Sequence, residues 1–336
     1  MFNMYIENTA ELSVTAERVS GDIWDATLPS LEGSTFFDRA QWQNAFKHKV
    51  SEIHYIHFRY KEKIIAGCAC GITFDTTGRL LFKTPFTSAF GGVLAKPELS
   101  FSLLYESIGA LRHYCAAVAK GENFEIQYVR RNRCSRGGDI NESEDFALLH
   151  WGFSLNIMQC EFFINLSNDI FLTKRYASMI RKMNRENTFS FEPSTPDEFI
   201  VARDTIVKQQ GKCITVPDEE IQKGCSLFPA NILAYKAVRN DETVAVLLTD
   251  RINEHCCIGR NWFVDKVAVK NNATLFLLWQ WINLVKEEKF KFAGFGSSAN
   301  TKNALNKGTI FFKERFGPLI HDSRKTYRLV FDKQGA

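Results

Sequence analysis

The chain has 336 residues, of which 45% are hydrophobic and 24% are charged, and its formal net charge at pH 7 is +4. This length exceeds the roughly 250–300 residues at which a single hydrophobic core usually stops growing, so we expect two domains. The composition is that of a folded protein without low-complexity tracts. The small positive excess disfavours DNA as a partner, because nucleic-acid-binding domains usually carry a concentrated basic face.

Cysteine usage and hydropathy indicate a compartment. No apolar run reaches the ~18–20 residues needed to span a bilayer, and the amino terminus lacks a basic-then-apolar signal pattern. The nine cysteines are scattered, with no Cys-x-x-Cys pair and no histidine cluster that would complete a zinc site. We therefore expect reduced thiols packed as small hydrophobic groups, no metal site and a cytoplasmic location.

The first half of the chain predicts a series of mixed α and β elements. Residues 10–49 form an opening segment. Alternating apolar positions on both sides of a polar turn then predict a hairpin, and apolar positions at helical spacing predict a long helix. The elements after the opening are a hairpin at 56–66, a helix at 103–120, a strand at 124–129, a short helix at 146–152 and a closing strand at 160–166.

The second half repeats this series. Its opening is predicted to be mostly helical, over residues 171–187 and 195–210, with Pro196 near the start of the second helix. The same elements then recur in the same order, as a hairpin at 235–246, a helix at 274–289, a strand at 290–295, a short helix at 311–317 and a closing strand at 327–331.

The spacing of the repeat supports a duplication. Phe146 and Phe311 are 165 positions apart, and so are Gly152 and Gly317. Three ordered matches are stronger evidence than a single chance similarity between strand-like patterns. The sequence therefore predicts an α/β protein with mixed sheets, built from two tandem units, residues 1–166 and 167–336.

Several short motifs carry a resemblance to a known family. A Gly–Ser loop follows the strand at 290–295, and a Phe-Lys-x-x-Phe-Gly element follows the loop. The motifs are Phe295-Gly-Ser-Ser298, Asn306-Lys-Gly308 and Phe312-Lys-Glu-Arg-Phe-Gly317, together with a basic stretch at 176–185 and a glycine loop at 88–92. In this order they resemble the GNAT superfamily in its duplicated form, and above all the Fem-type peptidyltransferases and related acyltransferase-like proteins of surface-polysaccharide synthesis.

The resemblance implies transfer of an acyl or aminoacyl group to an amine, with acyl-CoA or aminoacyl-tRNA as co-substrate and no permanently bound cofactor. Donor and acceptor would meet between two strands that splay apart. The donor's pyrophosphate would lie at the start of the following helix, where free N–H groups favour anions. That position falls on Lys270, Asn271, Asn272, Ala273 and Thr274. The family's usual loop, Arg/Gln-x-x-Gly-x-Gly/Ala, is absent here, so an ordinary helix cap by Asn272 is an equal alternative.

The loop after the strand at 290–295 is the predicted substrate site. Ligands of α/β sheets bind beyond the carboxyl ends of strands, and this loop is rich in small polar residues. The predicted substrate-binding residues are Phe295, Gly296, Ser297, Ser298, Asn300 and Asn306. The alternative is a solvated turn.

Acyl transfer to an amine requires a base and a group that stabilises the oxyanion. We predict Asp265 as the base and Lys313 as the stabilising cation, while Glu314, His255 and His321 are other candidate bases. The alternatives are a surface carboxylate and a solvated lysine.

Two basic clusters are candidate phosphate sites. Arg181 and Arg185 share one helical face with Lys174, which suits the phosphates of a nucleotide, a lipid-linked sugar or a tRNA; a solvated face is the alternative. The cluster of Arg130, Arg131, Arg133 and Arg136 occupies the matching position of the first unit and is interpreted as a degenerate site.

Two classes of function remain after these observations. The first is an N-acyltransferase acting on an amino group of a sugar, cell-wall or polysaccharide precursor, with contact to a membrane surface left open. The second is a duplicated fold without catalysis that binds a glycan or a protein. RNA binding through the basic helix is a third and weaker reading, which the net charge of +4 disfavours.

Overall fold

The computed structural model describes residues 12–87, 90–137, 142–170, 172–210, 216–297 and 306–332. The chain packs into two units. Unit 1 contains Met1–Arg131, Ile140–Met158 and Lys325–Ala336, and unit 2 contains Asn132–Asp139 and Gln159–Arg324. None of the helices within the described ranges has both the length and the apolar character required to cross a membrane.

The sheet of unit 1 has the strand order β1-β2-β3-β4-β6-β13, and β5 pairs with β3. Only the pair of β4 and β6 is parallel. The strands are β1 (Thr15–Val19), β2 (Glu52–Tyr60), β3 (Lys63–Phe74), β4 (Leu80–Thr84), β5 (Leu94–Ala95), β6 (Phe124–Arg130) and the last part of β13 (Leu319–Phe331).

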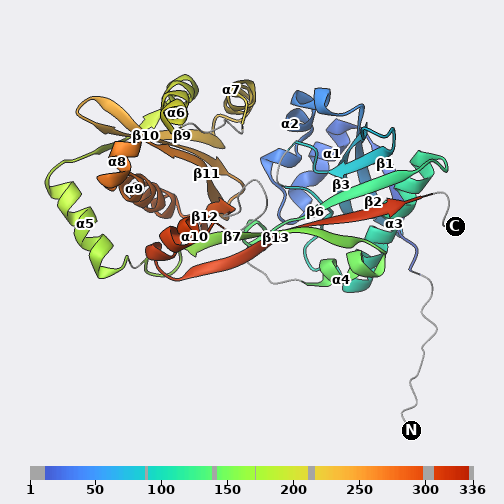
Figure 1. Ribbon diagram of the computed structural model, residues 1–336. Helices are drawn as coiled ribbons and strands as arrows, with labels where there is room; N and C mark the ends of the chain where they lie inside the picture. The colour runs from blue at the N-terminus through green and yellow to red at the C-terminus, as the bar shows by residue number, and fades with distance from the viewer. Residues whose placement is uncertain are drawn as a thin grey trace, which may run out of the picture. The chain divides into compact units, whose positions relative to one another are not determined.

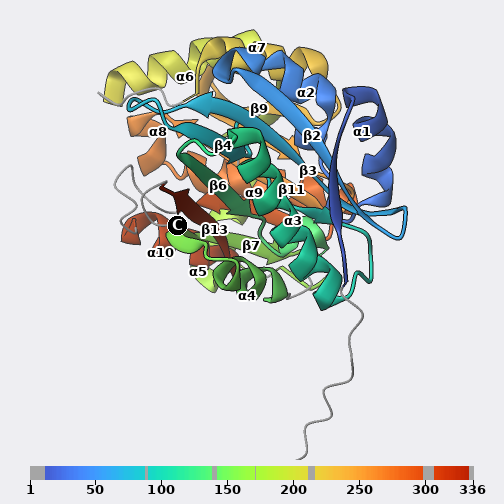
Figure 2. The same ribbon diagram turned by 90° about the vertical axis from the view of Figure 1, so that its right-hand side faces the viewer.

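Successive side chains of a strand point to opposite faces, and both faces of this sheet are apolar. Ile56 and its partner Cys68 pack on one face against α3 and α4, which lie side by side in Figures 1 and 2. Tyr55 and its partner Ala69 pack on the other face against Trp24 of α1. The helices of unit 1 are α1 (Gly21–Thr27), α2 (Ala40–Ala45), α3 (Phe101–Ala119) and α4 (Ser143–His150), with single turns at Leu28–Ser30, Phe36–Asp38 and Lys47–Lys49.

The sheet of unit 2 has the strand order β7-β12-β11-β10-β9-β8. The strands are β7 (Ser154–Asn165), β8 (Ser190–Ser194), β9 (Ile232–Arg239), β10 (Glu242–Arg251), β11 (Cys256–Val264) and β12 (Phe292–Ser297). The helices are α5 (Lys174–Arg185), α6 (Pro196–Gln210), α7 (Asp218–Leu227), α8 (Lys266–Lys270), α9 (Ala273–Glu287) and α10 (Lys307–Lys313), with single turns at Cys134–Arg136 and Glu314–Phe316.

Helices cover both faces of this second sheet. Figure 1 shows α6 and α7 on one side of β9 and β10, and α9 on the other. The apolar residues of α9 form one core with Tyr176, Ile180 and Met183 of α5, which explains why those three alternate with exposed basic residues along that helix.

The predicted repeat is present in the structure. Each unit has a hairpin, a long helix, a following strand and a short helix, as β2–β3, α3, β6 and α4 and as β9–β10, α9, β12 and α10. The prediction of an α/β fold with mixed sheets, built from two repeated units, is confirmed.

The closing strands β7 and β13 pair across the two halves of the sequence. Residues Glu161 to Asn165 of β7 pair with β12 of unit 2, whereas Lys325 to Phe331 of β13 pair with β6 of unit 1. Each closing strand therefore pairs with a strand that belongs to the other half of the sequence. An apolar pattern specifies which face of a strand is buried but does not specify the edge to which the strand binds. The division at residues 166 and 167 remains a prediction about the duplicated sequence.

Candidate active site

The strands β11 and β12 of unit 2 diverge. They run parallel and pair at three positions only, Cys256 with Phe292, Cys257 with Ala293 and Ile258 with Gly294. Both strands continue beyond these pairs, β11 to Val264 and β12 to Ser297. The backbone groups near the carboxyl end of β12 are thus available to other partners, and this is the place where ligands bind in α/β sheets. The turn away from β11 uses a φ of +64° at Gly296, which favours glycine.

Lys313 occupies this divergence. Its Nζ lies 2.9 Å from the carbonyl oxygen of Gly296 and 3.4 Å from that of Ser297, and donates to both. The side chain is 0% exposed, and the ammonium lies over the rings of Phe162 and Trp262, at 5.2 Å and 5.6 Å from the ring centroids. The last residue of α10 therefore places one cation between two aromatic rings and the carbonyl oxygens of Gly296 and Ser297.

Burial and a nearby acid act in opposite directions on this lysine. Burial lowers the pKa of Lys313 to about 7, although the carboxylate of Glu161 favours the charged form. Glu161 lies on β7 opposite Ser297, and burial raises the pKa of its carboxyl group. The carboxylate accepts a hydrogen bond of 2.6 Å from Nδ2 of Asn132 and lies 3.6 Å from Nη1 of Arg324. Both protonation states of Lys313 are therefore accessible near neutral pH.

Glu161 was missed by the sequence analysis. The available signal was an acid inside an otherwise apolar closing strand, Cys160 to Leu166, where a buried charge requires a partner. Lys313, whose charged form the Glu161 carboxylate favours, lies more than 150 positions away in the sequence. Only the fold brings the two groups together.

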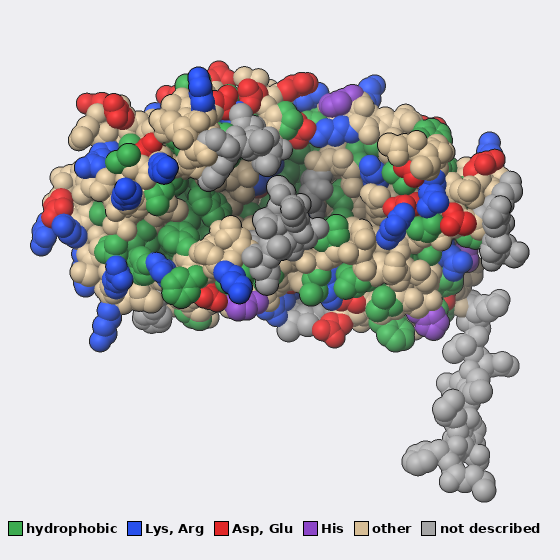
Figure 3. Space-filling model, in the orientation of Figure 1, with side chains coloured by type: hydrophobic (Ala, Val, Ile, Leu, Met, Phe, Trp, Pro, Cys, Tyr) green, Lys and Arg blue, Asp and Glu red, His purple; other side chains and the backbone are tan. Residues whose placement is uncertain are grey.

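A cavity of about 450 Å³ lies beside the divergent strands. It combines aromatic walls with small polar groups and one arginine, and Figure 3 shows apolar side chains gathered in a hollow over α9 and α10. It brings together Asn272, Thr274 and Asn306 of the predicted sites. The lining residues are Tyr176, Trp262, Val269, Asn272, Thr274, Leu275, Asn306, Gly308, Thr309, Phe312 and Arg315.

The predicted donor position at the start of α9 is built differently from a capped helix. Asn272 adopts the left-handed conformation with a φ of +67°, and its side chain makes no capping hydrogen bond, so the expectation that it caps is wrong. A left-handed residue cannot place its side chain over the first turn as an extended cap residue does. Lys270 is exposed, Asn271 donates back to the carbonyl of Val267 at 3.4 Å, and Ala273 is buried.

The predicted substrate residues are divided by the structure. Phe295 is 1% exposed and its ring packs against Phe316 at 5.3 Å, so it belongs to the core of unit 2. Asn306 caps α10 by accepting from the N–H of Thr309 at 3.1 Å, and it also lines the cavity of about 450 Å³. Ser298 and Asn300 lie outside the described residues. Arg181 and Arg185 are exposed on α5 and do not line this cavity.

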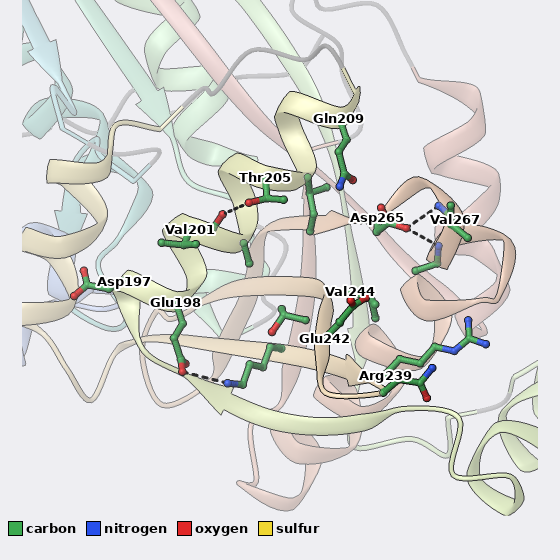
Figure 4. Close-up of a pocket in the computed structure, with 16 residues that line it drawn as sticks. Asp197, Glu198, Val201, Thr205, Gln209, Arg239, Glu242, Val244, Asp265 and Val267 are labelled. Carbon is green, nitrogen blue, oxygen red and sulfur yellow. Dashed lines mark hydrogen bonds and ion pairs between the residues drawn. The ribbon is translucent and has the colours of Figure 1, made fainter.

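Asp265 lines a second and larger cavity of unit 2, of about 1060 Å³, between α6, the β9–β10 hairpin and the start of α8 (Figure 4). Its Oδ1 accepts from the N–H groups of Val267 at 2.8 Å and Ala268 at 3.0 Å, so the carboxylate caps α8. The larger cavity also contains the ion pair of Glu198 with Lys236 at 3.3 Å. Asp265 is not part of the lining of the smaller cavity.

The other candidate bases are scattered. The ring of His321 packs on Phe162 at 5.2 Å, His255 lies 3.4 Å from Glu254 at the surface, and Glu314 is exposed. Within the described ranges, no group of three or more His, Cys, Asp or Glu side chains is arranged to hold a metal ion.

The matching position of unit 1 is closed by an internal network. Arg131 is 2% exposed, forms an ion pair with Asp38, and donates to the carbonyls of Gly91 at 2.8 Å and Gly33 at 3.0 Å. At the spacing of 165, the position of Lys313 corresponds to the buried Leu148. Unit 1 thus has a buried leucine at the position that corresponds to Lys313, and its arginine cluster as a degenerate site stays a prediction.

Comparison with solved structures identifies the fold. FemX superposes with a TM-score of 0.63 and 9% identity, covering 92% of this chain and 96% of FemX. L-PGS from Bacillus licheniformis has a TM-score of 0.55 and 15% identity, with coverage of 95% and 94%. A tandem GNAT protein from the clavulanic acid biosynthesis pathway has a TM-score of 0.54 and 10% identity, with coverage of 95% and 98%.

Comparison of the sequence with family models and curated proteins gives no match. At identities of 9–15% the likeness concerns the fold and extends over nearly the whole of each chain. The chain therefore has the duplicated GNAT-like fold that FemX and the tandem GNAT protein share, as the sequence motifs predicted.

Proposed function

We propose that this protein is an N-acyltransferase that moves an acyl or aminoacyl group from acyl-CoA or aminoacyl-tRNA to an amino group of a sugar, cell-wall or polysaccharide precursor. The observation that carries the proposal is the buried Lys313 ammonium in the divergence of β11 and β12. The duplicated GNAT-like fold supports the transferase class.

The chemistry assigned to Lys313 follows from its donors. An ammonium has three N–H donors, and the carbonyls of Gly296 and Ser297 accept two of them. In the proposed reaction the third donates to the oxyanion that forms when the amine attacks the donor's carbonyl carbon, which requires the substrate to reach the buried Nζ between β11 and β12. In this dry environment such a bond is worth more than in water, because the group is already oriented and needs no reorganisation.

The proton and the leaving group complete the reaction. The attacking nitrogen forms the C–N bond and loses a proton, the carbonyl carbon's bond to the sulfur of CoA or to the ribose oxygen of tRNA breaks, and the leaving thiolate or alkoxide takes up a proton, so that one proton moves from the amine to the leaving group overall. A lysine whose pKa lies near 7 exchanges protons readily at neutral pH. Asp265 as the general base remains a proposal, and its carboxylate must leave the N–H groups of α8 to act.

The donor is tested by ligand-induced stabilisation of the full chain. Acetyl-CoA, CoA and a panel of nucleotide-linked amino sugars are added, and the thermal midpoint is measured. A ligand at about 100 times its dissociation constant stabilises the folded state by about 2.7 kcal/mol. A shift with CoA that Lys270→Glu and Asn272→Asp abolish supports a donor at the start of α9. No shift with any CoA compound removes the acyl-CoA version and leaves transfer from aminoacyl-tRNA or a binding role.

One observation favours a second candidate, a binding protein without catalysis. Lys313 is 0% exposed, and its hydrogen bonds tie α10 to β12 as a structural link would. Transfer assays with Lys313→Met and Lys313→Arg separate the two functions. Loss of transfer in a variant that keeps its ligand-induced stabilisation supports the enzyme. Ligand binding without any detectable transfer by the unmodified chain supports the binding protein.

A further inference from the structure

Among the described residues that line the smaller cavity of unit 2, Arg315 is the one charged side chain and none is a carboxylate. The Cζ of Arg315 lies 4.5 Å from the ring centroid of Phe311, one helical turn earlier, and 4.9 Å from that of Tyr176 on α5. Its two neighbours along the chain differ in burial: Glu314 is exposed, and Phe316 is in the core. The rings of Phe311 and Tyr176 therefore hold the Arg315 guanidinium at the wall of the cavity.

No ion pair in the described part of the chain involves Arg315. This contrasts with Arg131, Arg203 and Arg251, which each lie against a carboxylate. A guanidinium stacked on aromatic rings uses its face for that contact and keeps its N–H donors for an acceptor in its plane. Carboxylates and phosphates match this fork of donors with two parallel hydrogen bonds.

The other walls of the cavity suit a ligand that is part apolar and part polar. Trp262, Phe312 and Leu275 supply apolar surface, while Asn272 and Asn306 supply amide groups. Phe311 is 61% exposed beside Arg315, which leaves an aromatic surface at the mouth of the site. A neutral ligand would give the Arg315 guanidinium no anionic partner in a partly desolvated position.

We infer that Arg315 is a specificity-determining residue that selects an anionic substrate, one whose carboxylate or phosphate binds the guanidinium while its adjoining planar or apolar part lies against Trp262 and Phe312. This inference rests on the proposed function for the identity of the site as a substrate site. It adds the chemical class of the group that is recognised and the residue that recognises it.

Three probes of similar size test the inference on the full chain. Benzoate carries a carboxylate, phenyl phosphate carries a phosphate, and benzamide is the neutral control. Binding is measured by calorimetry for the unmodified chain, Arg315→Gln and Arg315→Lys. Arg239→Gln is the matched control, since Arg239 is a partly buried arginine of unit 2 that lines the larger cavity.

At least one anion should bind the unmodified chain about tenfold more tightly than benzamide, as expected for a charge-assisted bidentate contact. Arg315→Gln should remove this preference, Arg315→Lys should restore only part of it, and Arg239→Gln should retain it. A stronger effect with benzoate indicates a carboxylate in the substrate, and a stronger effect with phenyl phosphate indicates a phosphate. Equal binding of all three probes, or a preference that persists in both Arg315 variants, overturns the inference.

The outcome is separable from that of the proposed function. Probe binding needs no reaction, so an Arg315-dependent preference for anions stands even if no transfer is ever detected. Conversely, transfer that depends on Lys313 but shows no dependence of anion binding on Arg315 leaves the function in place and removes the inference. The thermal midpoint of each variant, compared with that of Arg239→Gln, separates lost binding from lost folding.

Discussion

The Nζ of Lys313 lies 2.9 Å from the carbonyl oxygen of Gly296, and this hydrogen bond connects the end of α10 with the part of β12 that has left β11. A parallel neighbour would normally satisfy such a carbonyl. Here a side chain does so, and the lysine becomes buried as a result. The desolvation of its ammonium is the main cause of the lowered pKa of Lys313.

Lys313 should make the stability of the protein depend on pH. Its pKa is about 7 in the folded chain and 10.5 when unperturbed, so between these values the unfolded state binds more protons. The free energy of unfolding should therefore rise with pH across this window, by at most about 1.4 kcal/mol per pH unit from this residue. Lys313→Met lacks this contribution. Denaturant unfolding of both proteins at several pH values gives the difference, and a difference that stays constant through the window contradicts the assignment.

Glu161 and Lys313 should be energetically coupled. Replacing Glu161 by Gln removes the anion that favours the charged lysine, so the pKa of Lys313 should fall below about 7. A double-mutant cycle of Glu161→Gln and Lys313→Met should give a coupling of roughly 1–3 kcal/mol in the free energy of unfolding near pH 7. The control pairs Glu161→Gln with Lys286→Met, an exposed lysine of α9. Coupling no larger than in this control means that the two groups do not interact.

Asp265 should act mainly on the stability of α8. Asp265→Ala removes a cap that accepts from two N–H groups and should cost about 1 kcal/mol, whereas Asp265→Ser keeps a capping oxygen and should cost less. Thermal unfolding measures both variants. The transfer rate of Asp265→Ser then tests the base: a rate near that of the unmodified chain assigns the residue to capping, and a loss of more than about a hundredfold assigns it to catalysis.

The end of β13 should be essential to unit 1. A chain that stops at Arg324 loses the strand that pairs with β6, together with the buried Tyr327 and Leu329 and the bond of 2.7 Å from Tyr327 to Asp145. β6 then becomes an exposed edge strand, which promotes aggregation. We expect this truncation to lower the thermal midpoint sharply or to yield insoluble protein. A chain that stops at Phe331 retains the ladder and is the control. Equal stability of the two truncations would show that the pairing contributes nothing.

Much of the local structure was determined by the sequence itself. The hairpins β2–β3 and β9–β10, the helices α3 and α9 and the strands after them were predicted from periodicity, because apolar spacing reports directly which face of each element is buried. The repeat spacing of 165 and the Phe-Lys-x-x-Phe-Gly element also pointed to the duplicated fold and to Lys313. The hairpins, helices and strands depend on residues that are close together in the chain, and the repeat follows from comparing two such stretches.

Other elements carried too little local signal. The helix α7 and the strand β8 are short and mostly exposed or half-buried, so the sequence analysis did not identify them. The sequence analysis also left open an ordinary helix cap by Asn272. Asparagine is compatible both with an extended cap and with the left-handed region that Asn272 adopts, so the sequence could not distinguish the two.

Only the tertiary structure decided the partners of the closing strands and the environment of the candidate site. The apolar positions of β7 and β13 indicate which side chains are buried, yet either strand fits either free edge until the whole chain is packed. The sequence does not show which groups surround Lys313, Glu161 and Arg315. Their desolvation, and therefore their chemistry, arises from groups brought next to them over long sequence distances: Phe162 and Trp262 for Lys313, and Tyr176 for Arg315. A pKa or a binding preference depends on such surroundings, which local sequence does not contain.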